Sequence, residues 1–400
     1  MNVSQGTLSI FASKVTPPTP RPYQADAISA GIDFLKSDAA YNAFEILPTG
    51  AGKSIVIANI VKGLDDLVLI LQPSKEILKQ NAAKYQSYGY AAGIYSASVG
   101  SKFIGKATFA TIGSIINKTH LFRKFKYIII DECHLVSSED SESMYNKFLK
   151  AMPQAKVLGL TATPYRLQYT NEGAMLCFLN RTSPKIFQHL IYYVQNDVLF
   201  NAGHLAKLEY YSFNIIDRSQ LKVNDKGTDF TEQSLKAYYR TASIPNKIAG
   251  YANRLLDKRK NLLVFCSLLD EAYIVQKLVT GSVVIHGESK DRDQILKNFT
   301  SGKIKCLINV GVLTTGFDYP ELECVLLSKS TMSLSLYYQI FGRGLRPHPN
   351  KQTCWLVDLG GNIDKFGRFE TMIIKKNKQG LYALFNNGRQ LTDVPMVKAA

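Results

Sequence analysis

Short runs of apolar residues recur along most of the chain, and longer stretches with helical periodicity separate them. The runs are rich in Ile, Leu and Val and show little polar alternation, which favours parallel strands buried on both faces. In the first half of the chain these runs are Ala43–Leu47, Leu67–Gln72, Tyr127–Asp131 and Lys156–Leu160. In the second half they are Leu262–Cys266, Val283–His286, Cys306–Val310, Cys324–Leu327 and Cys354–Asp358. Amphipathic stretches such as Lys75–Tyr85 and Asp291–Phe299 lie between the runs, so the pattern predicts βαβ units and three-layer α/β domains.

The alternation of strands and helices weakens between about Gln168 and Pro245, where polar and aromatic residues become more frequent. We therefore predict two tandem α/β domains with parallel sheets flanked by helices. The first domain is expected over residues 1–205 and the second over residues 246–360. Residues 206–245 are expected to form the connection between them.

A basic C-terminal tail is expected over residues 361–400, after the last predicted strand. Its cations are interleaved with aromatic residues, in the set Lys375, Lys376, Lys378, Tyr382, Phe385 and Arg389. Two arrangements fit this pattern: a hairpin packed back on the second domain, or a solvated tail.

Basic residues outnumber acidic ones. The 400 residues include 48 Lys and Arg against 32 Asp and Glu, a formal net charge of +16. A charge of this sign and size is typical of proteins that meet a polyanion, because each cation placed on a phosphate releases counterions. Simple solubility is the alternative explanation. A hydrophobic content of 46% is ample for buried cores, and the 20% of charged residues argues against disorder.

The cysteines indicate a reducing environment and no structural zinc. No two of them are close enough in sequence to form a CxxC half-site; they are Cys133, Cys177, Cys266, Cys306, Cys324 and Cys354. No apolar run approaches the roughly 20 residues that span a bilayer, and the N-terminus lacks a signal-peptide pattern. We therefore expect no membrane association and a cytoplasmic location.

Residues 47–54, which read LPTGAGKS, carry the clearest chemical signal. They follow the predicted strand Ala43–Leu47 and precede the helix-like Ile55–Val61, which is the context of a P-loop. Glycines let the backbone amides face phosphate oxygens, and the helix N-terminus adds partial positive charge. Lys53 is expected to reach the β- and γ-phosphates of ATP, and Ser54 to ligate Mg²⁺. The ATP-binding residues predicted here are Thr49, Gly50, Ala51, Gly52, Lys53 and Ser54.

A pair of acids, Asp131 and Glu132, ends the predicted strand Tyr127–Asp131. Two adjacent carboxylates at the end of a buried strand need a cation or a reaction. Asp131 is expected to hold Mg²⁺, and Glu132 to act as the base toward an attacking water. His134 follows, either as a relay to other motifs or as a satisfied polar residue. The hydroxyls of the segment Thr161–Thr163 are expected to bond the acid pair.

With these residues in place, the chain resembles a superfamily 2 helicase of the DExH class over about residues 20–360. The resemblance also rests on residues 21–24, which read RPYQ, and on residues 311–320, which read GVLTTGFDYP. Residues 339–346, which read QIFGRGLR, complete the series in the expected order. The resemblance implies two RecA-like P-loop NTPase domains that close on ATP and Mg²⁺ at their interface.

The resemblance implies further residues of the nucleotide site. Gln24 would bond the edge of the adenine base, and Gln339 would help to order the water. Arg343 and Arg346 would meet the γ-phosphate across the cleft, although both could instead be surface or nucleic-acid contacts. The nucleotide contacts implied outside the P-loop and the acid pair are Arg21, Gln24, Gly316 and Asp318.

A nucleic-acid track is also implied, made by hydroxyls and helix N-termini that hold backbone phosphates. Ordinary helix caps and buried strands use the same residue types, so part of this set has a structural alternative. The residues are Pro73, Ser74, Thr111, Ser114, Ser267, His286, Thr314 and Thr315.

Within the superfamily, the segments LPTGAGKSIVIA, IIIDECHLV and YYQIFGRGLRP are most similar to bacterial RadD-type DNA repair ATPases. Those proteins continue into a cysteine-bearing C-terminal region, and no such cluster precedes Ala400, so we expect a minimal, phage-borne relative. The resemblance implies an ATP-dependent helicase or translocase with DNA favoured over RNA. An RNA-remodelling ATPase, the motor component of a restriction-type complex and a non-hydrolysing clamp are the alternatives. The resemblance predicts no particular protein partner.

Overall fold

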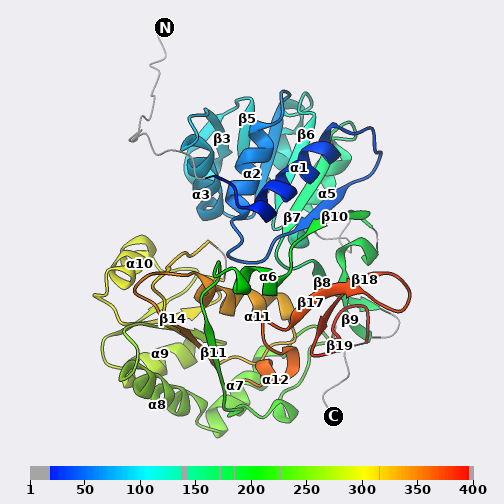
Figure 1. The fold of residues 1–400 in the computed structure, drawn as a ribbon. Coiled ribbons are helices and arrows are strands. Elements are labelled where there is room, and N and C mark those ends of the chain that lie inside the picture. Colours follow the sequence, from blue (N-terminus) through cyan, green and yellow to red (C-terminus); the bar gives the residue numbers. More distant parts are fainter. Residues whose placement is uncertain are drawn as a thin grey trace.

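Two α/β domains lie one above the other in the computed structural model, with two small sheets beside their junction (Figure 1). The structure describes residues 19–136, 143–170, 173–183, 185–225, 227–314 and 316–395. Both domains have parallel sheets covered by helices on the two faces, so the predicted fold class is confirmed. Within these ranges no helix combines the length and the apolar character that a bilayer crossing requires.

The first domain is built on an eight-stranded sheet in the order β10-β1-β7-β6-β2-β5-β3-β4. Every pair is parallel except β3 with β4, and the strands are β1 (Ala43–Ile46), β2 (Val68–Gln72), β3 (Ala92–Ser96), β4 (Ser101–Phe103), β5 (Ala107–Thr111), β6 (Tyr127–Asp131), β7 (Lys156–Thr161) and β10 (His189–Tyr193). Helices α1 (Pro22–Lys36), α2 (Lys53–Lys62) and α3 (Lys75–Gln86) share one hydrophobic core with one face of the sheet. Helices α4 (Ile112–Ile115) and α5 (Met144–Lys150) cover the other face.

The second domain has a six-stranded, fully parallel sheet in the order β11-β16-β15-β12-β14-β13. Its strands are β11 (Leu208–Ser212), β12 (Leu262–Cys266), β13 (Ser282–Ile285), β14 (Cys306–Val310), β15 (Cys324–Leu327) and β16 (Cys354–Asp358). One face packs against α7 (Glu232–Thr241), α8 (Ile244–Leu256) and α9 (Leu269–Leu278). The other packs against α10 (Arg292–Thr300), α11 (Leu334–Phe341) and α12 (Asn362–Phe366).

Short 3₁₀ helices complete several connections. They are η1 (Ala97–Val99), η2 (Ile116–Leu121), η3 (Cys133–Leu135), η4 (Leu179–Arg181), η5 (Arg218–Gln220) and η6 (Gly342–Leu345). The last of these continues α11 directly and carries part of the segment that reads QIFGRGLR.

The crossing between the domains lies earlier than the predicted connection over residues 206–245. Strand β11 falls inside that range, yet it pairs with β16 as the edge strand of the second sheet. The chain crosses over residues 194–207, here called the linker, which contains α6 (Asn196–Asn201). An edge strand is flanked on one side only, so β11 is half-buried and lacks the continuous apolar run that marks the central strands.

The C-terminal tail forms a sheet of its own. Strands β17 (Met372–Lys376), β18 (Tyr382–Asn386) and β19 (Arg389–Gln390) are antiparallel and are here called the C-terminal sheet. It lies beside the hairpin of β8 (Tyr165–Thr170) and β9 (Gly173–Phe178), on the right in Figure 1. The folded alternative for the tail is therefore the one observed.

Candidate active site

A cleft of about 410 Å³ lies between the two domains and collects residues that are far apart in the sequence. The first domain contributes Pro48, Thr49, Gly50, Gly52, Lys53, Ser54, Ile55, Ile77, Gln80, Asn81, Lys84, Asp131 and Glu132. The second domain contributes Gly316, Phe317, Asp318, Gly342, Arg343 and Arg346. Most of the predicted nucleotide residues thus line one cleft, whereas Arg21, Gln24, Ala51 and Gln339 stand outside its lining.

The phosphate loop follows β1 and leads straight into α2, as predicted. Gly50 and Gly52 have φ angles of +88° and +81°, which residues with a Cβ rarely adopt. The surroundings exclude a side chain as well, because a Cβ at Gly52 would lie 2.5 Å from Nε2 of Gln24. At Gly50 the nearest atom would be Cδ2 of Leu205, at 2.6 Å. Helix α2 begins at Lys53, so its free amides face the cleft.

Gln24 supports the phosphate loop from behind. Its Nε2 donates to the carbonyl of Ala51 at 2.7 Å, and its Oε1 accepts from the backbone amide of Arg21 at 2.9 Å. The hydroxyl of Tyr23 donates to the same carbonyl of Ala51 at 3.0 Å. Only 2% of Gln24 is exposed, so both ends of its amide are engaged inside the protein. The contact with an adenine base stays a prediction.

The acid pair lies at the end of β6, opposite the phosphate loop. Oδ2 of Asp131 accepts from Nδ2 of Asn81 at 2.8 Å, and Oε1 of Glu132 lies 3.3 Å from Nζ of Lys53. Glu132 has a φ of +52°, an unusual backbone conformation for a residue with a side chain. This turn directs the two neighbouring carboxylates to different partners.

The two carboxyl groups differ in acidity. Burial, together with the negative charge of Glu132, raises the pKa of Asp131 to about 6, and the charge of Lys53 acts in the opposite direction. Burial also acts to raise the pKa of Glu132, but the nearby ammonium group of Lys53 outweighs it, and the net shift is downward. Glu132 is therefore the more acidic of the two groups, and its carboxylate is ionised near pH 7. Its role as the base stays a prediction.

His134 links the two domains. Its Nδ1 lies 2.8 Å from the hydroxyl of Thr161 at the end of β7, and its Nε2 lies 3.2 Å from Nε2 of Gln339 in α11. Burial lowers the pKa of His134 to about 4, so the ring is neutral near pH 7. A neutral ring can accept the amide hydrogen of Gln339 while it donates to Thr161. This geometry favours the relay role over that of an isolated polar residue.

Two arginines approach the cleft from the second domain. Arg343 donates from Nη1 to the carbonyl of Phe317 at 2.7 Å and from Nε to that of Gln339 at 3.2 Å. Burial, with the neighbouring charge of Arg346, lowers the pKa of Arg343 to about 10. Nε of Arg346 lies 3.2 Å from Oδ1 of Asp318. Both guanidinium groups therefore line the cleft, and their polar contacts named here are with residues of the second domain.

In the first domain, the residues predicted for the nucleic-acid track are engaged with the protein. The Ser74 hydroxyl caps α3 by accepting from the amide of Ile77 at 3.3 Å. The hydroxyls of Thr111 and Ser114 lie 2.9 Å apart, and that of Ser114 accepts from the amide of Ala97. Pro73 precedes this cap, after the end of β2. These contacts are helix-capping and loop contacts, so a phosphate contact stays a prediction.

In the second domain, Ser267 lies 3.3 Å from the hydroxyl of Tyr239. His286 lies after β13, with Nε2 at 3.4 Å from the hydroxyl of Tyr273. Thr314 is half-buried beside the cleft-lining Gly316. Thr315 lies outside the described residues, and its predicted role is untested.

Sequence reasoning missed three polar residues of α3 that line the cleft. They are Gln80, Asn81 and Lys84. A signal for Asn81 existed, since it lies on the apolar face of an amphipathic helix, between the buried Leu78 and Ala82. A polar residue on such a face needs a partner, and here the partner is Asp131.

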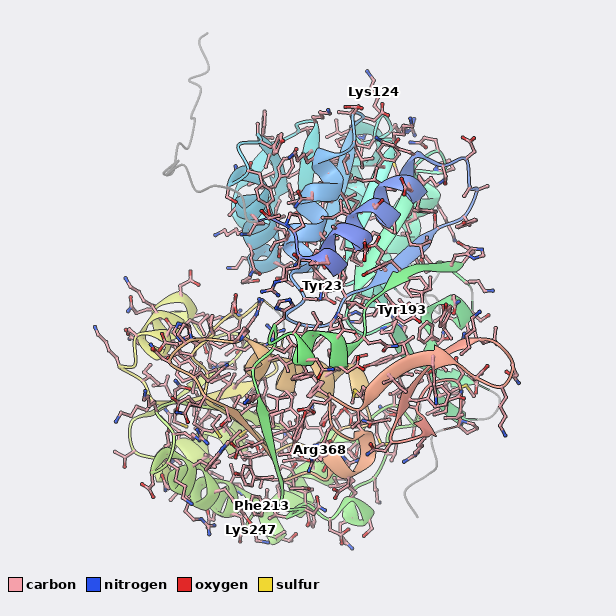
Figure 2. All side chains as sticks on the ribbon, in the orientation of Figure 1. Tyr23, Lys124, Tyr193, Phe213, Lys247 and Arg368 are labelled. Atoms are coloured by element: carbon pink, nitrogen blue, oxygen red, sulfur yellow. The ribbon has the colours of Figure 1, made fainter. Side chains whose placement is uncertain are left out.

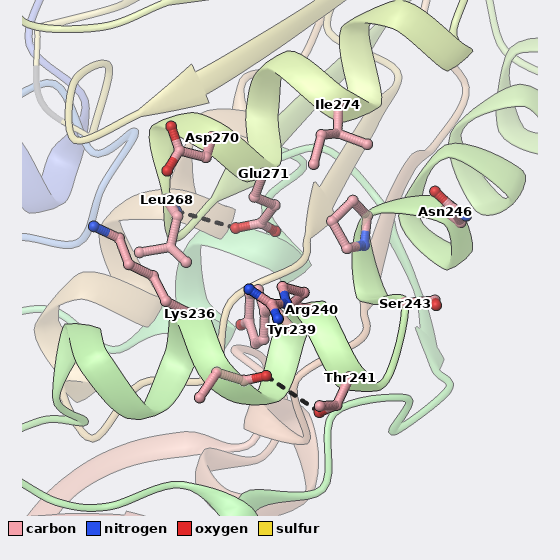
Figure 3. A pocket seen from close by; sticks show the side chains of 12 residues that line it. Lys236, Tyr239, Arg240, Thr241, Ser243, Asn246, Leu268, Asp270, Glu271 and Ile274 are labelled. Carbon is pink, nitrogen blue, oxygen red and sulfur yellow. Dashed lines mark hydrogen bonds between the residues drawn. The ribbon is translucent and has the colours of Figure 1, made fainter.

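A larger hollow of about 660 Å³ lies within the second domain, away from the cleft (Figure 3). It is bordered by α7, α8 and α9. The carboxylate of Glu271, in its wall, is engaged in hydrogen bonds within the protein. The Glu271 carboxylate accepts from the amides of Ser267 and Leu268 at 3.0 Å each, which caps α9. The chemistry predicted from the sequence therefore lies in the smaller cleft.

Fold and cleft together define a P-loop NTPase whose active site is divided between two RecA-like domains. Residues 18–166 match the family described as "Type III restriction enzyme, res subunit". Residues 247–348 match the "Helicase conserved C-terminal domain". The chain therefore belongs to helicase superfamily 2, and the predicted family is confirmed; the closer likeness to RadD-type proteins stays a prediction.

Curated relatives include a phage protein, a helicase and a DNA translocase. The chain is 26% identical over 318 residues to a "51.5 kDa protein" of a Lactococcus phage, covering 78% of this chain and 64% of that protein. It is 25% identical to the "Putative ATP-dependent helicase IRC3" of Saccharomyces cerevisiae, covering 86% of this chain and 52% of that protein. The "DNA 3'-5' translocase XPB2" of Sulfurisphaera tokodaii is also 25% identical, with 82% and 78% covered. The chain thus spans between half and two-thirds of the length of the first two relatives.

A solved structure shares the fold. The fragment structure of a putative HsdR subunit of a type I restriction enzyme from Vibrio vulnificus superposes with a TM-score of 0.66. Sequence identity is 21%, and the match covers 90% of this chain and 68% of that one. At this identity the likeness shows the two-domain fold alone.

Proposed function

We propose that the protein hydrolyses ATP and couples hydrolysis to movement along a strand of nucleic acid. The observation that carries the proposal is the composition of the cleft. Lys53 and Glu132 from the first domain face Arg343 and Arg346 from the second. A site of this kind is complete only when the two domains are together, so a chemical step inside it can drive their relative motion.

Nucleotide binding would use the phosphate loop. Its backbone amides and the ammonium group of Lys53 provide positive charge where the β- and γ-phosphates would lie. The hydroxyl of Ser54 and the carboxylate of Asp131 fit Mg²⁺, since both are hard oxygen donors in the same cleft. Mg²⁺ bound there would neutralise phosphate charge as it develops.

Hydrolysis would use Glu132 as the base. A water oxygen forms a bond to the γ-phosphorus while the bond to the β,γ-bridging oxygen breaks, and the water gives its proton to Glu132. ADP leaves with the electron pair of the broken bond. Lys53 now lies 3.3 Å from Glu132, so its attraction to phosphate would free this carboxylate when ATP arrives. Arg343 and Arg346 would stabilise the charge on the transferring group.

Movement would follow from opening and closing of the cleft. The contact of His134 with Gln339 crosses the cleft, so it must change when the domains separate. Backbone contacts from motifs on both domains would then hold the strand alternately. We infer little sequence specificity, because phosphate contacts carry no sequence information.

DNA is the favoured substrate within this proposal, supported by the likeness to a DNA translocase and to RadD-type proteins. We place the protein in the cytoplasm of a bacterial or phage-infected cell, where free thiols persist. The restriction-type family match over residues 18–166 supports a second candidate, the motor component of a restriction complex.

The test is ATP hydrolysis measured with single-stranded, duplex, forked and branched DNA and with single-stranded RNA. We expect hydrolysis to rise most with DNA, and Lys53→Ala to remove most of the activity. Stimulation by RNA alone would assign the protein to RNA remodelling. Hydrolysis that ignores every nucleic acid would overturn the motor proposal.

A further inference from the structure

Gln195 and Asn196, here called the linker pair, lie where the chain leaves the first domain. They follow β10 and begin the crossing to the second domain. Both groups of the Gln195 amide bind the backbone of Ile374 in β17, with Nε2 donating to the carbonyl at 2.6 Å and Oε1 accepting from the amide at 2.9 Å. At this position the Gln195 side chain thus makes the two backbone hydrogen bonds that a neighbouring strand would make with β17.

Asn196 makes two buried contacts in different directions. Its Nδ2 donates to the carbonyl of Phe369 at 2.9 Å, and its Oδ1 accepts from the hydroxyl of Tyr338 at 2.9 Å. Only 8% of Asn196 and 4% of Tyr338 are exposed. One linker residue therefore joins helix α11 to the segment that leads into the C-terminal sheet.

Tyr338 carries this connection to the phosphate loop. Tyr338 and Asn196 line one small space together with Pro48 of this loop. Burial raises the pKa of Tyr338, and contacts with the side chain of Asn196 and with the backbone of Thr49 act in the opposite direction. Farther along, Gly342 approaches the same loop residue, since a Cβ there would lie 3.0 Å from Cγ2 of Thr49. Helix α11 through Tyr338 and the turn that bears Arg343 through Gly342 thus both approach Thr49.

The C-terminal sheet packs beside the same phosphate loop. Met372, Ile374 and Leu384 pack toward Pro48 of the phosphate loop and Pro164 after β7, around a residual space of only about 20 Å³. The sheet is also held to η4, the turn that follows the hairpin, because Arg181 binds both the carbonyl of Tyr382 and the carboxylate of Asp393. Its strands lie beyond residue 348, where the second family match ends.

We propose that Asn196 is a positioning residue for ATP hydrolysis, which holds Tyr338 and therefore Arg343 in register with the phosphate loop, supported by the C-terminal sheet. This inference rests on the proposed function, because it assigns Asn196 a part in that reaction. The C-terminal sheet is then part of the motor and not an appendage. A displacement of about 1 Å in a catalytic group can cost on the order of 10²-fold in rate, so one lost hydrogen bond here is sufficient to matter.

The first experiment compares turnover with nucleotide affinity in Asn196→Ala and Tyr338→Phe. Each should lower kcat about tenfold or more with saturating DNA and leave the KM for ATP within about twofold. The double variant should lose no more than the worse single variant, because both remove one connection. Asn201→Ala is the matched control, since Asn201 is an exposed asparagine in the same helix.

Asn196→Asp separates positioning from packing. A protonated carboxyl is nearly isosteric with the amide and can donate to Phe369 while it accepts from Tyr338. The ionised form cannot donate, and burial beside a carbonyl raises the pKa of the introduced group. Relative to the unaltered protein, activity of Asn196→Asp should therefore rise as pH falls from about 8 to about 6. A constant ratio across this range would contradict the proposal.

A second readout does not depend on hydrolysis. All six native cysteines are buried, so spin labels can be directed to Lys124→Cys in the first domain and Lys247→Cys in the second, at opposite ends of the molecule (Figure 2). With a non-hydrolysable ATP analogue, the unaltered protein should give one narrow interdomain distance. Asn196→Ala should broaden that distribution.

The outcomes are distinguishable. If the unaltered protein hydrolyses no ATP, the proposed function fails, whereas the distance measurement still decides whether Asn196 fixes the relative position of the two domains. If Asn196→Ala and Tyr338→Phe keep kcat within about twofold and leave the distance distribution unchanged, the positioning inference is overturned.

Discussion

At the scale of single residues, the cleft holds an ion pair that ATP would rearrange in the proposed reaction. Lys53 and Glu132 neutralise each other at 3.3 Å, which keeps two buried charges tolerable before substrate binds. The same pairing keeps Glu132 ionised and thereby ready to accept a proton. The ion pair therefore keeps Glu132 deprotonated before ATP binds.

Glu132→Gln should bind ATP and hydrolyse it slowly, because a carboxamide is a poor base. The expected loss is about 10² to 10⁴ in single-turnover rate. Lys53→Ala is the comparison, and it should weaken nucleotide binding as well. Normal turnover by Glu132→Gln would show that another group accepts the proton.

Glu45, in the centre of β1, gives a prediction about stability. Its side chain is fully buried, and within the described part of the chain neither carboxylate oxygen has a hydrogen-bond partner. Burial raises the pKa of Glu45 well above its usual value. The folded protein therefore keeps a proton that the unfolded chain releases above about pH 4.3, so stability falls as pH rises from there toward the folded pKa.

Glu45→Met removes this dependence and keeps a side chain of similar size. We expect it to raise the free energy of unfolding at pH 8 by about 1–3 kcal/mol, and by less at pH 5. Urea denaturation at both pH values measures the difference. Glu232→Met, at an exposed position of α7, should show no such pH dependence. An equal effect of Glu45→Met at both pH values would mean that Glu45 is not protonated in the fold.

At the scale of elements, α11 and the 3₁₀ turn that follows it form the side of the active site that belongs to the second domain. This segment carries Gln339, which meets His134, and then the two arginines. The arginines differ in their surroundings. Arg343 holds the carbonyl of Phe317, whereas Arg346 is more exposed and pairs with Asp318.

Arg346→Ala should leave folding and nucleotide affinity largely intact but cut turnover sharply. Arginine fingers in related phosphoryl transfers are worth roughly 10³ to 10⁵ in rate. Arg343→Ala should lose turnover similarly and also some stability, because the carbonyl of Phe317 loses its donor. Lysine should rescue poorly at either position, since the guanidinium fork is lost.

The measurement for this pair is steady-state ATP hydrolysis against nucleotide binding, both with saturating DNA. Loss of DNA binding with retained DNA-independent hydrolysis in Arg346→Ala would place that arginine on the nucleic-acid track. The proposal that Arg346 completes the active site from the second domain would then be wrong.

At the scale of the whole molecule, the net charge of +16 bears on how the protein meets its substrate. Binding of labelled single-stranded DNA should weaken steeply as salt rises from about 50 to 200 mM, with log Kd linear in log salt. The slope reports the number of phosphates neutralised. Binding that is insensitive to salt would show that the excess charge serves solubility alone.

The central strands were predictable because burial on both faces requires continuous apolar runs. The runs over Tyr127–Asp131, Leu262–Cys266 and Cys354–Asp358 coincide with β6, β12 and β16. The edge strands β10 and β11 were not predicted as strands, and strands in the tail were predicted only as one of two alternatives. They are half-buried or short, so their sequences mix apolar, aromatic and charged residues.

The sequence by itself determined the family and the fold class and predicted the chemistry of the phosphate loop and the acid pair, because each depends on residues adjacent in the chain. Only the tertiary structure decided which distant groups complete the site. It assigned Asn81 to Asp131 and Gln24 to the carbonyl of Ala51. It also joined Asn196 to Tyr338 across 142 positions of the chain. Such contacts depend on how two sheets, a linker and a tail pack together, and residue spacing along the chain carries no record of that packing.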